Sequence, residues 1–384
     1  MRIVWINKST WKKPGPVAYM GLLNACSFAW NNLNTDFFIH GSGDDDIEAD
    51  LTGYYGLKPH PLLTIHLTSK TKGLQRTIYN EALKKIAGYC DSGERVLALT
   101  REVGILPSLA KLKKRCPSLT VLHEVHDYFG SIKHLPSRGF SDFRRMVSER
   151  LVLGRIDGLI CLTEYQRALY QQWLPQLPMM SIPLGSAKPD QIMTDKLEHR
   201  RQQRRVAYIG RHHRYKGSDL VLTLGQHLKD ENIELTSYGG NTHYVTGLQQ
   251  QAKASGLEHT LKFLPFLSPN QLNRALDQEV SLGIVPLQDT YYSRYLTCPV
   301  KALDFMAHGL PIVGSDIPSV TDVLGHCGDI VPHDNEQAYI SSILRLLNDS
   351  DHYATMSQRA FNRAQAISWQ SRAKKIIAFV NHKT

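Results

Sequence analysis

The sequence has little that would hold a chain together through covalent bonds or metal ions. Its 384 residues include only six cysteines, and no two of them form the CxxC pair typical of zinc and redox sites. A disulfide framework or a zinc site is therefore excluded as an organising feature. We expect the cysteines to be small buried hydrophobic residues, and we expect no metal site.

Long apolar runs are also missing. No run reaches the roughly 20 residues that a membrane-spanning helix requires, and the first residues, MRIVWIN, are typical of a strand rather than a signal peptide. A cytoplasmic protein is predicted, with a place at the inner face of the membrane left open. No GxGxxG motif follows a predicted strand, which argues against a dinucleotide-dependent oxidoreductase, and there is no low-complexity segment or repeat of solenoid length.

Acidic residues are scarce relative to basic ones. The chain has 35 Asp and Glu against 45 Lys and Arg, a formal charge of +10, and residues 1–185 hold most of the excess, with 23 basic and 16 acidic residues. Basic clusters at 111–115 and 144–150 are best interpreted as solvated helix faces. Contact with an anionic membrane or acceptor is the alternative. Nucleic acid is not expected as a partner, because no binding motif or interleaved aromatic pattern accompanies the charge.

The length and the alternation of patterns predict an α/β protein with two domains. Strand-like and helix-like segments alternate along the whole chain, which is typical of a parallel sheet in each half. The polar stretch 188–204 predicts an exposed connection. We therefore predict an N-terminal Rossmann-like domain over 1–185, joined by a C-terminal helix over 368–384. A second Rossmann-like domain is predicted over 186–367.

Two loops of the first domain carry polar residues of interest. A strand at Ile3–Ile6 leads into a basic loop with Gly15 and then a helix, an arrangement that can turn backbone N–H groups toward a phosphate. The three aspartates at 44–46 could bind a hard cation, although a polar surface loop is the favoured interpretation.

Two histidines follow a predicted strand at Leu119–Leu122. In the extended segment His123-Glu124-Val125-His126, alternate residues share a face, so Glu124 and His126 lie on one side. The carboxyl edge of such a strand is where doubly wound sheets bind ligands. His126 is therefore the better active-site candidate, and His123 is predicted to be a core residue.

The second domain opens with a strand that ends in a basic loop. The strand at 205–210 is followed by Arg211, Lys216 and a helix from Ser218. Two fixed cations beside a helix N-terminus suit the two phosphates of a nucleotide diphosphate. A solvated basic turn is the alternative interpretation.

The stretch 297–316 combines a loop, a helix, a turn and a strand. Pro299 suits the first turn of a helix and Gly309 suits the left-handed residue after its end. Apolar residues recur at helical spacing, which places Lys301 and Asp304 on an outward polar side. An ordinary capped helix and an anion site at its N-terminus both fit this pattern. Leu310–Val313 is predicted to be a strand.

Gly210-Arg211 through Lys216-Gly217, together with Pro299-Val-Lys301 through Pro311, resemble the retaining GT-B glycosyltransferases of family 4, also called group 1 glycosyltransferases. The second domain matches this family nearly throughout, and the first matches it more loosely. The resemblance implies two Rossmann-like domains facing across a cleft that holds a nucleotide diphosphate sugar.

This resemblance assigns roles to individual residues. Arg211 and Lys216 would hold the diphosphate and stabilise the leaving group without a metal ion, and His126 would contact the donor sugar as the third catalytic residue. Asp304 would bind the ribose. The other donor-binding residues implied are Gly15, Gly210, Gly239, Phe266, Leu267, Thr297 and Lys301. No cofactor is expected besides the UDP- or GDP-linked sugar itself.

The predicted function is retaining transfer of a sugar from this donor to an acceptor hydroxyl, in cell-envelope polysaccharide or glycoconjugate synthesis. The acceptor would be a glycan, a lipid-linked molecule or another hydroxyl compound, and peripheral contact with an anionic membrane stays open. Leu296 stands where the family has its first glutamate. A nucleotide-sugar epimerase or hydrolase on the same fold, or a catalytically silent binding protein, are the alternatives.

Overall fold

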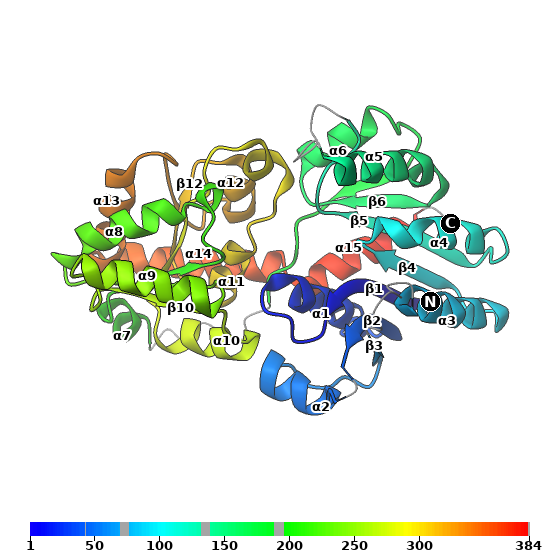
Figure 1. Ribbon diagram of the computed structural model, residues 1–384, viewed down its shortest axis with the longest axis horizontal. Coiled ribbons are helices and arrows are strands. Elements are labelled where there is room, and N and C mark those ends of the chain that lie inside the picture. The colour runs from blue at the N-terminus through cyan, green and yellow to red at the C-terminus, as the bar shows by residue number, and fades with distance from the viewer. Residues whose placement is uncertain (43, 70–76, 132–138, 188–195, 383–384) are drawn as a thin grey trace. The chain divides into compact units, whose positions relative to one another are not determined.

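The computed structural model describes residues 1–42, 44–69, 77–131, 139–187 and 196–382 (Figure 1). The chain forms two compact units. The first consists of Met1–Pro183 and Trp369–Thr384, and the second of Leu184–Ser368. Each unit contains one sheet in which every pair of neighbouring strands is parallel, so the predicted α/β class is confirmed.

The first unit has a seven-stranded sheet in the order β3-β2-β1-β4-β5-β6-β7. Its strands are β1 (Arg2–Thr10), β2 (Thr35–Gly41), β3 (Leu63–Ser69), β4 (Val96–Thr100), β5 (Leu119–Val125), β6 (Gly158–Cys161) and β7 (Met179–Ser181). The central strands are apolar and fully buried, as is typical of parallel sheets covered on both faces.

The helices of the first unit connect these strands. They are α1 (Pro16–Ala29), α2 (Ile47–Asp50), η1 (Leu51–Tyr55), α3 (Thr77–Asp91), η2 (Val103–Ile105), α4 (Leu106–Lys113), α5 (Phe140–Val152), η4 (Leu153–Arg155), α6 (Glu164–Gln171) and α15 (Trp369–Asn381). The last of these, α15, packs on α1, with the Asn31 side chain donating to the Gln370 carbonyl at 3.1 Å (Figure 1). The C-terminal helix is thus part of the first unit's core.

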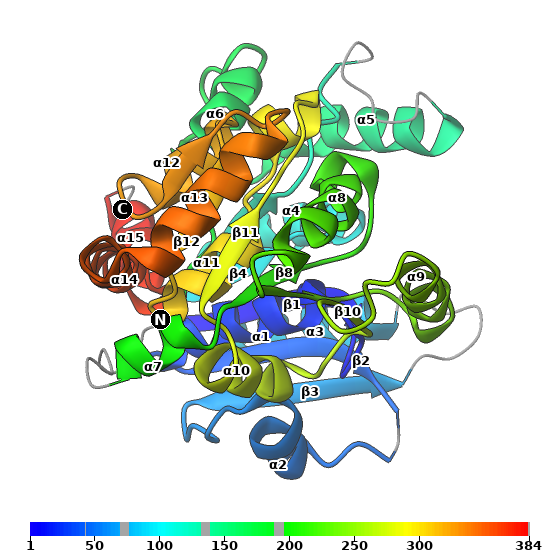
Figure 2. The same ribbon diagram turned by 90° about the vertical axis from the view of Figure 1, so that its left-hand side faces the viewer.

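The second unit has a six-stranded sheet in the order β10-β9-β8-β11-β12-β13 (Figure 2). Its strands are β8 (Arg205–Ile209), β9 (Glu234–Tyr238), β10 (Leu261–Leu264), β11 (Leu282–Val285), β12 (Ile312–Ser315) and β13 (Asp329–Val331). Its helices are α7 (Leu197–Gln202), η6 (Arg214–Lys216), α8 (Ser218–Lys229), α9 (Thr242–Ala254), α10 (Pro269–Gln278), η7 (Tyr292–Leu296), α11 (Val300–Ala307), α12 (Pro318–Leu324), α13 (Glu336–Asn348) and α14 (Ser350–Ala366).

The order of strands reverses at one place in each sheet. In the first unit this happens between β1 and β4, and in the second between β8 and β11. Loops that leave neighbouring parallel strands in opposite directions open a crevice at the carboxyl edge, where ligands of such sheets bind. The loops after β1 and β8 both begin there, which directs attention to the same two loops that the sequence singled out.

The polar stretch 188–204 contradicts one expectation. Residues 188–195 lie outside the described residues, but 197–202 form α7 and Arg200 is buried. The Arg200 guanidinium donates to the carbonyls of His308 at 2.9 Å and Asp277 at 3.1 Å. Glu198, His199 and Gln202 of this helix are exposed, as predicted. The prediction is wrong for Arg200, because two carbonyl oxygens accept hydrogen bonds from its charged side chain inside the unit.

The stretch 297–316 forms the elements expected of it, with one correction. Helix α11 begins at Val300 after Pro299, Gly309 has a φ of 60° just beyond the helix end, and β12 begins at Ile312. However, Lys301 is only 8% exposed, so the prediction that it faces outward is wrong. None of the helices among the described residues is long and apolar enough to cross a membrane.

Candidate active site

The carboxyl ends of β8 and β9 are joined by two glycines. Gly210 has a φ of 136° and Gly239 a φ of 142°, conformations that residues with a Cβ rarely adopt. A Cβ on Gly239 would lie 2.4 Å from the Gly210 carbonyl oxygen, so the two backbones can touch only because this side chain is absent. This contact holds the start of the loop after β8 against the end of β9.

Lys301 extends from α11 toward this loop. Its ammonium nitrogen lies 4.0 Å from the centre of the Tyr208 ring and has no hydrogen-bond partner among the described residues. The Tyr208 hydroxyl donates in turn to the carbonyls of Lys216 at 3.2 Å and Arg211 at 3.3 Å. Burial, with the charge of Lys216 adding to it, lowers the pKa of Lys301 well below its usual range. The cation–π contact offsets only part of the cost of burying this charge.

Arg211 and Lys216 complete a group of three cations, which we call the cation cluster (Arg211, Lys216 and Lys301). Burial, with the charge of Arg211 adding to it, lowers the pKa of Lys216. Arg211 is exposed, and its guanidinium carbon lies 5.9 Å from the centre of the Phe266 ring. No ion pair found among the described residues includes a member of the cluster. The cluster can therefore accept an anion without first breaking a salt bridge.

The remaining predicted donor-binding residues of the second unit lie after β10, after η7 and in α11. Phe266 and Leu267 follow β10, with the Phe266 N–H donating to the Gly240 carbonyl at 3.1 Å, and Thr297 follows η7. Asp304 lies one turn into α11, where burial raises its pKa to about 7. Leu296, just before Thr297, is a core residue at 2% exposure.

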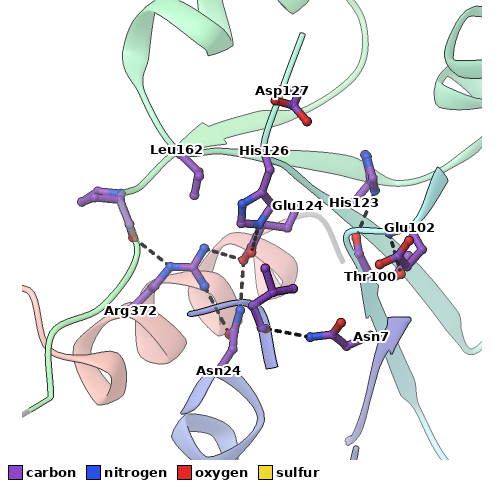
Figure 3. A network of polar contacts seen from close by, with 12 residues as sticks. Asn7, Asn24, Thr100, Glu102, His123, Glu124, His126, Asp127, Leu162 and Arg372 are labelled. Atoms are coloured by element: carbon purple, nitrogen blue, oxygen red, sulfur yellow. Dashed lines mark hydrogen bonds and ion pairs between the residues drawn. The ribbon is translucent and has the colours of Figure 1, made fainter. Parts of the chain in front are cut away.

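In the first unit, His126 belongs to a buried polar group that we call the Glu124 network (Asn24, Glu124, His126 and Arg372; Figure 3). Nε2 of His126 lies 2.7 Å from Oε1 of Glu124. The other carboxylate oxygen accepts from Arg372 at 2.7 Å and from Asn24 at 3.0 Å. Burial opposes the ionisation of Glu124, but Arg372 and His126 outweigh it and lower its pKa far below the usual range.

His123 lies apart from this network. It is 1% exposed, and its Nδ1 donates to the Thr100 carbonyl at 3.0 Å, so the prediction of a core residue is confirmed. Burial lowers the pKa of His123 to about 3. His126 also has a lowered pKa, because burial and the charge of Arg101 outweigh Glu124. Both histidines are therefore neutral near pH 7.

Gly15 ends the loop between β1 and α1 with a φ of 100°, and no atom would lie within 4 Å of a Cβ added there. The loop itself is anchored at Lys12, whose ammonium group contacts Asp45 at 3.0 Å and Asp50 at 2.9 Å. Asp46 accepts from the Ala49 N–H and caps α2. Two of the three clustered aspartates thus have defined structural roles. No group of three or more metal-ligating side chains occurs among the described residues.

The structure brings some of the predicted residues together and adds others. Gly210, Gly239, Lys216 and Lys301 converge on the end of β8, and Phe266 borders Arg211. Tyr208, Asn24 and Arg372 could not be selected from the sequence, since the local pattern around each is that of an ordinary core or surface residue. The alternation of Glu124 and His126 was the only available signal for the network.

The comparisons with known proteins agree with this geometry. The family model for the group 1 glycosyl transferases matches residues 203–349, which span β8 to α13. An uncharacterised glycosyltransferase of Haemophilus influenzae is 23% identical over 223 residues, which cover 56% of this chain and 59% of that protein. The chain therefore spans little more than half the length of this curated relative.

Solved structures resemble the whole chain. The sucrose-phosphate synthase of Thermosynechococcus elongatus superposes with a TM-score of 0.68 at 16% identity, covering 100% of this chain and 99% of that one. The Anabaena protein Alr3699/HepE, solved in complex with UDP-glucose, gives a TM-score of 0.67 at 17% identity, covering 98% and 99%. Such identities establish the fold alone. With its two parallel sheets and these whole-chain superpositions, the chain has the GT-B fold, and its residues 203–349 are similar to the group 1 glycosyl transferases.

Proposed function

We propose that the protein transfers a sugar from a nucleotide diphosphate sugar to an acceptor hydroxyl with retention of configuration, in cell-envelope polysaccharide or glycoconjugate synthesis. In this reaction the bond from the anomeric carbon to the diphosphate breaks, a bond to the acceptor oxygen forms, and the proton of the acceptor hydroxyl passes to the departing diphosphate. The departing diphosphate gains negative charge, so the residues that stabilise it determine the rate. His126 would contact the sugar, and Asp304 the ribose.

The observation that carries this proposal is the buried ammonium of Lys301. A charged group at 8% exposure without a hydrogen-bond partner among the described residues is costly unless a ligand supplies an anion. Arg211 and Lys216 add two more cations, and the N-terminus of α8, which has no side-chain cap at Gly217, adds the positive end of a helix dipole. Three positive charges match a diphosphate better than a single carboxylate. UDP-glucose, which the Anabaena protein binds, is the first donor to test.

A thermal-shift screen of nucleotide sugars tests the proposal directly, because a ligand that binds only the folded protein raises its melting temperature. We expect UDP- or GDP-linked sugars to stabilise the protein and the free sugars to have no effect. Radiolabelled donor then separates the alternatives: an epimerase or hydrolase forms product from donor alone, whereas a transferase requires an acceptor. Binding without turnover across an acceptor panel would favour a silent binding protein.

We further propose that the acceptor is presented at an anionic membrane, against which α5 lies. Four apolar side chains spaced three or four residues apart are exposed on this helix: Phe140 (82%), Phe143 (47%), Val147 (37%) and Leu151 (62%). The exposed arginines Arg144 and Arg150 flank this stripe on either side, and Met146 and Val152 face the core. An apolar stripe bordered by cations suits the interface of a bilayer with anionic headgroups.

Vesicle flotation tests this surface. We expect the protein to float with vesicles that contain phosphatidylglycerol, and the double variant Phe140→Ser/Leu151→Ser to remain unbound. Ile330→Ser, at an apolar residue of the second unit that is 38% exposed, is the matched control. Equal flotation of the double variant, or no flotation of the wild type, would disprove membrane contact. Concentration-dependent dimerisation that the double variant abolishes would instead assign the stripe to a second copy.

A further inference from the structure

The Glu124 network joins residues that are far apart in the sequence. Arg372 on α15 meets Glu124 across 248 residues, and Asn24 on α1 meets it across 100. Glu124 and Arg372 are both 2% exposed. Figure 3 shows Arg372, Asn24 and His126 converging on the carboxylate from three elements. A buried arrangement of this kind costs free energy to assemble, so its polar atoms must be matched closely.

The polar side-chain atoms of the Glu124 network are largely satisfied by hydrogen bonds. Arg372 donates to Glu124, to the Asn24 side-chain oxygen at 3.2 Å and to the Pro183 carbonyl at 2.9 Å. Asn24 both donates to Glu124 and accepts from Arg372, which fixes the orientation of its amide. Glu124 then accepts from His126 on its remaining oxygen. Among the described residues, the ring atom of His126 without a hydrogen bond is Nδ1.

We propose that Glu124, held by Arg372 and Asn24, is a positioning residue that fixes His126 as the neutral tautomer with its proton on Nε2. A carboxylate only accepts hydrogen bonds, so the His126 nitrogen that faces it must donate. Because Arg372 already balances the charge of Glu124, the histidine does not need a second proton. Nδ1 is then presented as an acceptor, and it receives a hydrogen bond from a hydroxyl of the substrate.

His123, three residues before His126 on the same segment of chain, has the opposite tautomer. His123 donates from Nδ1 to the Thr100 carbonyl, so its Nε2 is the unprotonated nitrogen. The two rings lie three residues apart on one segment of chain, and only their neighbours distinguish them. The tautomer of His126 is therefore set by the carboxylate of Glu124, which the distant residues Arg372 and Asn24 hold in place. The assignment of Nδ1 to a substrate hydroxyl rests on the proposed function, whereas the tautomer does not.

The decisive variant is Glu124→Gln, which preserves volume. Arg372 can only donate, and the Asn24 oxygen already accepts from Arg372, which leaves its NH2 group to donate to the atom they share. The glutamine oxygen must therefore take that place, and its NH2 group must face His126. Nε2 of His126 would then have to accept, and the proton would move to Nδ1. Long-range ¹H–¹⁵N NMR of the ¹⁵N-histidine-labelled full chain reports the tautomer, with His126→Gln identifying the signal.

We expect the Nε2–H tautomer in the wild type and the Nδ1–H tautomer in Glu124→Gln. The same tautomer in both proteins, or a wild type with the proton on Nδ1, would overturn the proposal. If sugar transfer is found, Glu124→Gln should lower kcat about 10- to 100-fold and leave nucleotide affinity within about twofold. Absence of transfer in the wild type would count against the proposed function alone, since the tautomer is measured without substrate.

A second variant tests the proposal without depending on the orientation of the introduced glutamine amide. The charged groups near His126 are Glu124 and Asp127 from its own segment, Arg101 after β4 and Arg372 from α15. Arg372→Met removes a cation and leaves the negative charge of Glu124, so the proton affinity of His126 should rise about tenfold or more. Lys374→Met, on the exposed side of the same helix, is the control and should leave the titration unchanged. No rise in Arg372→Met would contradict the network's role.

Discussion

The Glu124 network and the cation cluster differ in whether their buried positive charge is balanced by a partner. In the Glu124 network, Arg372 has three partners and its charge is balanced by Glu124. In the cation cluster, Lys301 is almost as buried but has no hydrogen-bond partner and no counter-ion among the described residues. The first arrangement is complete without a ligand, and the second is complete only with an anion.

The buried charge of Arg372 therefore stabilises the fold, whereas the buried charge of Lys301 is suited to binding a ligand. A balanced buried pair stabilises its own fold and is disrupted when one partner is removed. Like charges that face each other destabilise the free protein, and that cost is recovered when an anionic ligand binds. The comparison therefore makes predictions of opposite sign for similar substitutions.

The largest effect is expected from Arg372→Met on stability. This change leaves Glu124 buried without its cation and should cost about 3–5 kcal/mol of unfolding free energy. Urea denaturation followed by circular dichroism measures it, with Lys374→Met as a control that should stay within about 0.5 kcal/mol of the wild type. A loss below about 1 kcal/mol would mean that the network does not balance this charge.

In the cation cluster, Arg211→Ala and Lys216→Ala should each lower the turnover of sugar transfer by about 10²–10³, as expected for loss of one group that stabilises a developing charge. Neither change should reduce stability, because neither removes an ion pair found in the structure. Lys229→Ala, at the opposite end of α8, is the control. Near-wild-type turnover in both variants would refute the diphosphate site.

Lys301→Met provides the direct contrast to Arg372→Met. Removing a buried ammonium without a partner should raise the unfolding free energy by about 1–3 kcal/mol, while it weakens nucleotide binding. Urea denaturation and calorimetric titration with UDP and GDP measure the two effects. A variant that loses stability would show that Lys301 is already balanced in the free protein, and the comparison between the two centres would fail.

The smallest effect concerns the pH dependence of Asp304. Burial raises its pKa to about 7, whereas an unfolded chain releases the same proton near pH 3.9. As pH rises between these values the unfolded state loses the proton first, so ionisation destabilises the fold and the loss is complete above about pH 7. Asp304→Asn should therefore gain about 1 kcal/mol relative to the wild type for each pH unit between pH 5 and pH 7, and no more above that range. A pH-independent difference would contradict the burial of this carboxyl.

Much of the fold follows from local patterns in the sequence. The apolar strands, the Pro and Gly residues that bound α11, and the strand–loop–helix order around Gly15 and Arg211 are short-range features. They are visible because they depend on propensity and backbone conformation within a few residues. The position of His126 at a strand end is of the same kind.

The tertiary structure decided the ionisation and the partners of the polar residues. The sequence predicted Lys301 on an outward polar face, and packing against Tyr208 buried it instead. The stretch 188–204 was predicted to be exposed, yet distant carbonyl oxygens hold Arg200 inside, and a distant carboxylate oxygen does the same for Arg372. Hydrophobic patterning shows where an element has a buried face. It does not show which distant oxygen a charged group will contact there, and that contact sets the charge and the chemistry of the site.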